Sequence, residues 1–265
     1  MPFTPAHAVV ALPFVRTPLL PAAIAIGAMT PDLPLFLRGT PLTYQATHTN
    51  VLLSVTLALV LLVAWYLILR PAARELSPAW LARRLPAEWD RSAPLPGEWL
   101  ARRPRYASAL LLAGSLVIGV LSHIAWDAFT HEGRWGTRLL PALDETWGPL
   151  TGYKWLQHGS SVIALGILAL CAALWLSRRT PAAAPSRLLP APVRIAWWLS
   201  LPIALAAAWL LGLAAYGALT AAWTAQHLAY RVLPLACGVW GVLTIGLCVV
   251  VVVLRRRSAP PRLGT

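Results

Sequence analysis

Long uncharged runs alternate with short basic segments along the chain. The clearest run, residues 50–69 (NVLLSVTLALVLLVAWYLIL), has no charged residue over about twenty positions, the length that a membrane-crossing helix needs. Comparable runs cover residues 107–129, 161–176, 195–219 and 230–254. This pattern predicts five transmembrane helices.

The first fifty residues are also apolar, but prolines, His7 and Arg16 interrupt them. The opening MPFTPAHAVVALPFVRTPLL lacks the basic region that begins a signal peptide. RTPLLP, at residues 16–21, is typical of a turn, so residues 4–30 are predicted to form two short helices in a hairpin and not a sixth span. The predicted fold class is all-α, a polytopic membrane helix bundle of about five transmembrane helices plus an N-terminal helical hairpin.

Composition and charge agree with a membrane protein. The chain is 58% hydrophobic and 12% charged, whereas soluble domains have about 25% charged residues. Its net charge of +13 is concentrated in segments 70–105, 178–194 and 255–262. The positive-inside bias places such loops, and the C-terminus, in the cytoplasm, with the protein in a bacterial cytoplasmic membrane. Membrane lipids are therefore the expected partners of the basic residues, and nucleic acid is not.

The predicted organisation has four parts. Residues 1–176 form a domain that contains the hairpin, three spans and a basic interfacial loop (70–106); a linker (177–193), two C-terminal spans (194–254) and a disordered basic tail (255–265) follow. The sequence WLARR occurs twice in the basic loop, at 80–84 and 99–103, and fits either interfacial helices or turns of a solvated loop. The three cysteines fall within the predicted spans and are interpreted as small apolar residues.

Three ionisable residues lie at the end of the second predicted span, in SHIAWDAFTHEG. His123 and Asp127 are four residues apart, so on a helix they can face one point and act as paired metal ligands. His131 lies about 12 Å from His123 along the helix axis, too far for one ion to bind both. Two ions with Asp127 between them could use all three residues. Alternatively, the helix frays at Gly133 and His131 swings back.

The N-terminal region offers further ligands in His7, Asp32 and His48. Asp32 is the only acidic residue among the first seventy-four. An unpaired carboxylate beside an apolar segment is costly and indicates a functional site, and a bound cation is its simplest partner. The predicted topology puts His48, His123 and neighbouring ligands at the outer face of the membrane.

Simpler interpretations exist for each residue taken singly. A histidine at a span end often has an interfacial or packing role, Asp127 could pair with an arginine, and Asp32 could bind backbone N–H groups at a helix start. His158, in QHGSS, fits an additional ligand or a loop residue equally well. His227 lies in an aromatic belt between Trp223 and Tyr230 and is assigned a structural role.

Three stretches within residues 1–176 resemble a known family: MPFTPAHAVVALP…RTPLLPAAIAIGAMTPDLPLF, SHIAWDAFTH and YKWLQHGSS. They resemble DUF4184, a family of bacterial integral-membrane proteins of unknown function. That family's pattern is similar to YdjM-type membrane-bound metal-dependent hydrolases. More distantly, the order of His and Asp residues resembles the zinc-dependent phospholipase C and S1/P1 nuclease group, which are helical enzymes with up to three zinc ions.

The resemblance implies a set of metal ligands: His7, Asp32, His48, His123, Asp127 and His131. It also implies a catalytic role for Asp32, as a bridging ligand or as the group that positions the attacking water. Two features depart from the soluble enzymes, which use their mature N-terminal residue as a ligand and carry a second His-xxx-Glu pair. Gly-Ser-Ser-Val follows His158, so one or two divalent ions, with zinc favoured, are expected instead of three.

These observations favour a membrane-embedded metal-dependent hydrolase, with a phosphoester of a lipid or lipid-linked intermediate as the substrate at the outer face. Zinc would activate water for such chemistry. The alternative is a non-enzymatic membrane protein with a structural metal or a polar helix-packing cluster. A transporter fits less well, because the ligands gather at one face and no repeated half is visible. No GxSxG motif suggests a serine hydrolase.

Overall fold

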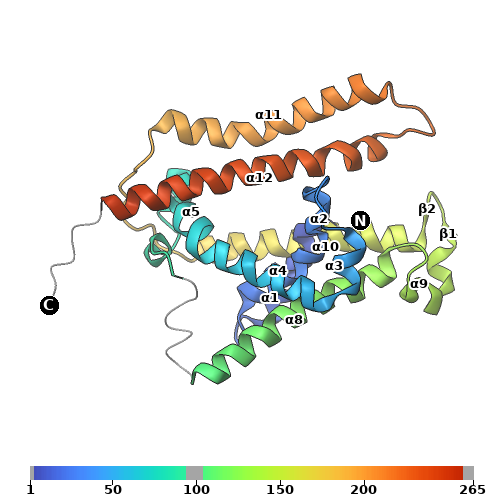
Figure 1. Cartoon of the computed structure of the whole chain (residues 1–265), viewed down its shortest axis with the longest axis horizontal. Helices are drawn as coiled ribbons and strands as arrows, with labels where there is room; N and C mark the ends of the chain where they lie inside the picture. The colour runs from blue at the N-terminus through green and yellow to red at the C-terminus, as the bar shows by residue number, and fades with distance from the viewer. Residues whose placement is uncertain (1–2, 94–103, 259–265) are drawn as a thin grey trace. The chain divides into compact units, whose positions relative to one another are not determined.

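The computed structural model describes residues 3–93 and 104–258, whose regular structure is nearly all helical (Figure 1). Five helices are long and apolar enough to cross a membrane: Val51–Leu76, Arg105–Thr130, Gly152–Ser177, Ala191–Tyr216 and Ala225–Arg257. The predicted all-α membrane bundle is therefore confirmed. The second WLARR copy and the tail from residue 259 onward lie outside the described residues.

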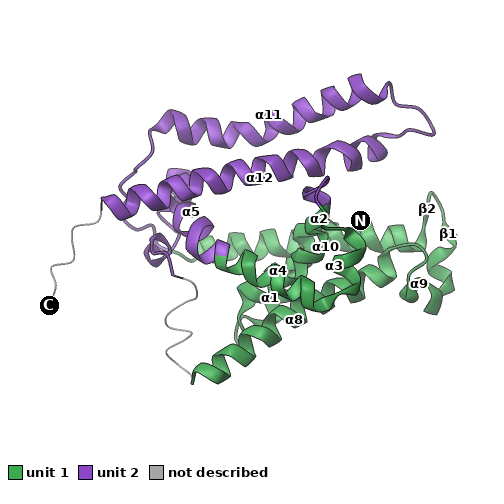
Figure 2. Cartoon of the chain, in the orientation of Figure 1, with its two compact units in different colours: residues 1–34, 41–63, 95–179 green, residues 35–40, 64–94, 180–265 purple. Residues whose placement is uncertain are grey.

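The chain divides into two compact units (Figure 2). Unit 1 comprises residues 1–34, 41–63 and 95–179, and unit 2 comprises residues 35–40, 64–94 and 180–265.

Unit 1 contains the N-terminal segments and most of the polar buried residues. Its helices are the 3-10 helices η1 (Thr4–Phe14), η2 (Thr30–Asp32) and η5 (Pro141–Asp144), and the α-helices α1 (Pro21–Met29), α3 (Tyr44–Thr49), α4 (Val51–Ala64), α8 (Arg105–Thr130), α9 (Trp135–Leu139) and α10 (Gly152–Ser177). The strands β1 (Thr146–Trp147) and β2 (Leu150–Thr151) form a small antiparallel pair before α10.

The N-terminal hairpin consists of η1 and α1, as the sequence predicts. The turn between them ends at Pro21, which takes the first position of α1, where its missing N–H costs nothing. The Leu20 N–H, just before this helix, donates to Ser115 Oγ of α8 at 2.9 Å. This bond fixes the start of α1 on the buried face of α8.

Small residues let α1 pack closely against α8. A Cβ atom added to Gly119 would clash with Ile24 O and lie 2.8 Å from Ala28 N, and one added to Gly27 would lie 2.7 Å from Leu116 O. Only glycine tolerates such a close approach of two backbones. The buried residues of α8 recur every three or four positions, so one face of this helix is directed at the hairpin.

Helices α8 and α10 run antiparallel. Trp126 Nε1 donates to Ser160 Oγ at 3.2 Å, and the Tyr153 hydroxyl donates to Glu132 Oε2 at 3.3 Å. The C-terminal end of α8 therefore meets the N-terminal end of α10. Helix α10 starts at Gly152, nine residues before the predicted span at Ser161. Its first turns carry Lys154 and Gln157, which break the apolar run but continue the helix.

Unit 2 contains residues 70–94 and 180–194 of the basic segments and the last two spans. Its helices are α6 (Ala79–Ala82), the 3-10 helix η4 (Ala87–Asp90), α5 (Arg70–Leu76), α11 (Ala191–Tyr216), α12 (Ala225–Arg257) and the π-helical turn η3 (Trp65–Leu69), and the short α2 (Leu33–Phe36) ends within it. The first span is predicted to end at Leu69, the last residue of η3, but the helix continues through α5 to Leu76. Pro71 explains the wide turn, because proline lacks the N–H that an α-helix would use.

A buried carboxylate organises the core of unit 2. Glu75 is 1% exposed and accepts the backbone N–H groups of Leu188 and Leu189 at 3.1 and 3.0 Å. Arg194 and Arg255 approach the same carboxylate at 3.8 and 3.9 Å. The segment between α10 and α11 is thus tied to the end of α5.

Candidate metal centre

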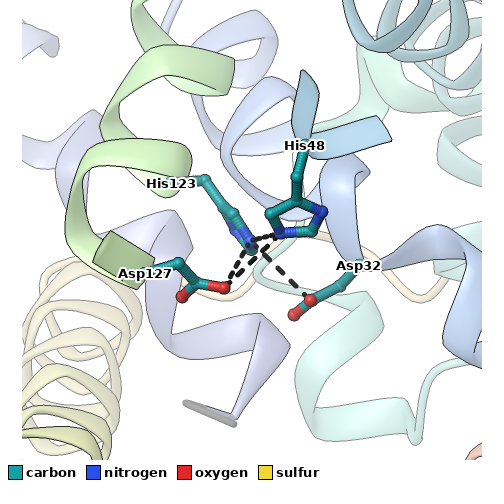
Figure 3. A group of neighbouring side chains, drawn as sticks. All are labelled: Asp32, His48, His123 and Asp127. Atoms are coloured by element: carbon teal, nitrogen blue, oxygen red, sulfur yellow. Dashed lines mark hydrogen bonds and ion pairs between the residues drawn. The ribbon is translucent and has the colours of Figure 1, made fainter. Parts of the chain in front are cut away.

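Four buried side chains of unit 1 converge on one point (Figure 3). Asp32 comes from η2, His48 from α3, and His123 and Asp127 from α8. Each offers one ligand atom, and these atoms all lie within 4.8 Å of one another. The exposed fractions of the four residues range from 0% for Asp32 and His123 to 7% for His48.

Local hydrogen bonds bring the two N-terminal ligands together. The Thr47 hydroxyl donates to Pro31 O at 2.7 Å, and the Ser54 hydroxyl donates to Thr47 O at 2.6 Å. The bond from Thr47 holds α3 against η2, so His48 and Asp32 face the same space. The second pair, His123 and Asp127, is one helical turn apart on α8, as the sequence predicts.

Backbone carbonyls determine the protonation of the two central histidines. His123 Nδ1 lies 2.7 Å from Ala28 O, and His48 Nδ1 lies 2.9 Å from Tyr44 O. A carbonyl oxygen can only accept, so each Nδ1 carries a proton, and the neutral form of each ring then has its lone pair at Nε2. The two Nε2 atoms lie 3.3 Å apart. Two facing lone pairs cannot bond to each other, but they can share a cation.

The distances between these atoms fit the edges of a coordination shell. Zinc binds histidine nitrogen at about 2.0–2.1 Å, which separates two ligands of a tetrahedral ion by about 3.3–3.4 Å. Asp127 Oδ2 lies 3.4 Å from His123 Nε2 and 3.5 Å from His48 Nε2. Asp32 Oδ1 lies 3.7 Å from His123 Nε2. These separations are too long for good hydrogen bonds, and the four atoms can enclose a cation.

Each carboxylate is oriented by a hydroxyl group. The Tyr44 hydroxyl donates to Asp127 Oδ2 at 2.9 Å, and the Thr4 hydroxyl donates to Asp32 Oδ2 at 2.7 Å. Burial, reinforced by the charge of Asp127, raises the pKa of Tyr44, so its hydroxyl remains a donor. Burial also raises the pKa of Asp32, which leaves this carboxylate in need of a positive partner.

His7 lies beside this group, on η1. Its ring centroid is 4.0 Å from that of His123, and its Nε2 lies 3.7 Å from Asp127 Oδ1. Burial, followed by the neighbouring His123, lowers the pKa of His7 to about 3. The ring is therefore neutral at pH 7, which is the form that binds metals.

His131 also lies near Asp127, because α8 ends at Thr130 and the ring turns back. His131 Nδ1 is 3.1 Å from Asp127 O and 3.6 Å from Asp127 Oδ2, and its Nε2 is buried without a hydrogen-bond partner. The helix ends three residues before Gly133, the position at which fraying is expected, and the His131 ring lies close to Asp127.

The remaining two histidines lie elsewhere. His158 is exposed on α10, and His227 accepts the Thr224 N–H at 3.2 Å in the cap of α12. Sequence reasoning missed Thr4 and Tyr44, although each stands three or four residues before a candidate histidine, His7 and His48 respectively. It also missed the carbonyl of Ala28, for which the sequence carries no side-chain signal.

A cavity of about 550 Å³ reaches His7, the residue beside the cluster. His7 is one of its lining residues, and most of the others are apolar residues of η1, α8 and α10; Ser122 and Ser160 add hydroxyl groups. This volume falls within the roughly 300–1,000 Å³ of ligand pockets. The buried polar cluster therefore has an apolar space next to it.

Comparison with known proteins gives a family. No curated protein and no solved structure matches the chain significantly. A family model described as "Domain of unknown function (DUF4184)" matches residues 1–256, which extends well beyond residue 176, where the recognisable motifs end. The protein that carries this buried Asp/His cluster is thus a member of the DUF4184 family.

Proposed function

We propose that this chain is a membrane-embedded metal-dependent hydrolase that uses one or two divalent ions, with zinc favoured, to cleave a phosphoester of a lipid or lipid-linked substrate. The observation that carries this proposal is the pair of facing Nε2 atoms of His48 and His123, 3.3 Å apart, with both Nδ1 atoms bonded to carbonyls. Two carboxylates complete the group, and two imidazoles with two carboxylates suit zinc.

The donor set supports hydrolytic chemistry. A bound zinc ion lowers the pKa of coordinated water to roughly 7 and stabilises negative charge that develops on the substrate. In the reaction, the water oxygen bonds to phosphorus, the P–O bond to the alcohol breaks, and a proton from the water passes to the leaving alcohol. Asp32, whose Oδ1 has no hydrogen-bond partner, would bind the ion or position the water.

The adjacent cavity supports a lipid-like substrate. Its walls belong in part to α8 and α10, which are apolar enough to cross a membrane. A hydrocarbon chain in this cavity would place a phosphoryl group near His7, which lines the cavity and lies beside the cluster. Membrane lipids are then the source of the substrate.

The charge distribution supports a site at the outer face of a bacterial cytoplasmic membrane. Arg105 begins α8, and Arg178 follows the C-terminal end of the antiparallel α10, so both lie away from the site. Asp127 lies three residues, about 4.5 Å, from the opposite end of α8. Basic ends favour the cytoplasm, which supports a position of the cluster near the outer surface.

A structural metal is the second candidate. One observation favours it: four protein ligands fill a tetrahedral shell, as in closed structural zinc sites. Such an ion would clamp η2 and α3 onto α8. Under this alternative the ion is required for stability, and no substrate is cleaved.

The test is to purify the full chain in detergent, measure bound metal, and assay a chromogenic phosphodiester and a phospholipid. Asp127→Asn should lose metal and hydrolysis, whereas the exposed His158→Gln should keep both. Bound metal without hydrolysis, combined with a lower unfolding temperature for Asp127→Asn, would select the structural alternative. An absence of metal from the wild-type chain after zinc loading would refute both candidates.

A further inference from the structure

Three buried polar atoms around Asp127 remain without a hydrogen-bond partner after the four-residue group is accounted for. They are His7 Nε2, Asp127 Oδ1 and His131 Nε2. Buried polar atoms are nearly always paired, so each of these atoms needs a partner. The side chains of His7 and Asp127 are 5% and 4% exposed, which leaves bulk water out of reach.

His7 Nε2 and Asp127 Oδ1 face each other at 3.7 Å. This distance exceeds that of a hydrogen bond between nitrogen and oxygen. It equals the 3.7 Å separation between Asp32 Oδ1 and His123 Nε2, two ligands of the first group. The pair therefore has the geometry of two ligands that share an ion.

This pair is distinct from the four-residue group. His7 does not belong to the set of ligand atoms that lie within 4.8 Å of one another, although its ring lies 4.0 Å from that of His123. Asp127 takes part in both, because its Oδ2 faces His48 and His123 while its Oδ1 faces His7.

We infer that a second divalent cation binds between His7 Nε2 and Asp127 Oδ1, with Asp127 as a bridging carboxylate. Bridged ions in two-metal hydrolytic sites lie about 3.5–4 Å apart. His131 lies near the other oxygen of Asp127, with its Nδ1 3.6 Å from Oδ2, so it is not assigned to this second ion.

The two ions would differ in their remaining coordination positions. The first is surrounded by four protein ligands, which suffice for a closed shell, whereas the second has two, His7 and Asp127, and retains open positions. His7 also lines the apolar cavity, so the open coordination positions lie on the side of the cavity. The second ion would then contact the phosphoryl group of the substrate, and the first ion would hold the surrounding helices in place. These two roles rest on the proposed function.

The test is the number of zinc ions per chain, measured by elemental analysis after equilibrium dialysis of the full chain in detergent. We expect about two ions for the wild type and for His158→Gln, and about one for His7→Gln. Gel filtration and thermal unfolding check that His7→Gln remains folded. One ion in the wild type, or two in folded His7→Gln, would overturn the second site.

A spectroscopic measurement keeps the test decisive if His7→Gln does not fold. In the wild-type chain loaded with Co²⁺, two carboxylate-bridged ions should show magnetic coupling in electron paramagnetic resonance. Two uncoupled ions would overturn the bridging role of Asp127. Neither measurement depends on activity: two coupled ions without any hydrolysis would refute the proposed function and leave the second site standing.

Discussion

Gly119→Ala is the substitution that most directly tests how the fold positions the centre. The added Cβ would clash with Ile24 O and lie 2.8 Å from Ala28 N, where ordinary contacts require about 3.4 Å or more. Helix α1 must then move away from α8 by several tenths of an ångström or more. Overpacking of this kind costs about 1–3 kcal/mol.

The movement should also weaken metal binding. The Ala28 carbonyl that fixes the His123 ring lies on α1, at 2.7 Å from His123 Nδ1. Disturbing such a partner of a metal-binding histidine typically costs about 10–100-fold in metal affinity. Gly119→Ala should therefore lower both the unfolding temperature and the affinity for zinc, measured by thermal denaturation and by competition with a chelator.

Gly114→Ala is the matched control, because it lies on the same helix and its added Cβ would meet nothing within 4 Å. Alanine favours a helix over glycine by about 1 kcal/mol, so this variant should be as stable as the wild type or more stable. Equal zinc affinity and equal stability for the two variants would refute the idea that close packing of α1 on α8 sets the His123 ring.

Three further substitutions test separate parts of the argument. Tyr44→Phe removes the 2.9 Å hydrogen bond to Asp127 and should weaken zinc binding about 10-fold or more without unfolding the chain; unchanged affinity in chelator competition would show that the bond does not orient the carboxylate. Ala164→Phe adds a ring to the wall of the cavity and should reduce hydrolysis of a long-chain phospholipid by about 10-fold while metal content and cleavage of a small phosphodiester persist; equal losses on both substrates would contradict a chain-binding role. Glu75→Gln leaves one of two backbone N–H groups unpaired and should cost about 1–3 kcal/mol in unit 2, with zinc content unchanged; a loss of zinc would show that the units are coupled.

The sequence predicts the helices well because hydropathy determines them. It fails at their ends, where polar residues continue a helix beyond the apolar run. Gly152–Ser160 extends α10 although Lys154 and Gln157 are polar, and Arg70–Leu76 extends the first span although it is basic and contains Pro71. Backbone hydrogen bonds continue the helix through these polar residues, whereas hydropathy indicates only which residues can lie in the lipid.

Some residues of the candidate site can be predicted from the sequence, and others cannot. Asp32 and Asp127 stand out in sequence because a carboxylate in an apolar setting is costly. The carbonyl of Ala28 has no such signal, because its role depends on how closely α1 approaches α8. That His7 faces the opposite oxygen of Asp127 from His48 follows from packing alone, and no spacing along the chain encodes it.

The order in which the ligands are synthesised has a consequence for assembly. His123 bonds to a carbonyl 95 residues earlier in the chain, and Leu20 bonds to Ser115 across the same interval. At about 5–20 residues per second, the ribosome needs roughly 5–20 s to make the intervening chain. During that time the N-terminal hairpin has no α8 to pack against, and Asp32 lacks the imidazole nitrogen of His123. A cation that needs all four side chains of the cluster would then enter only after α8 has been made, and its uptake during biogenesis would report that α8 has packed against the hairpin.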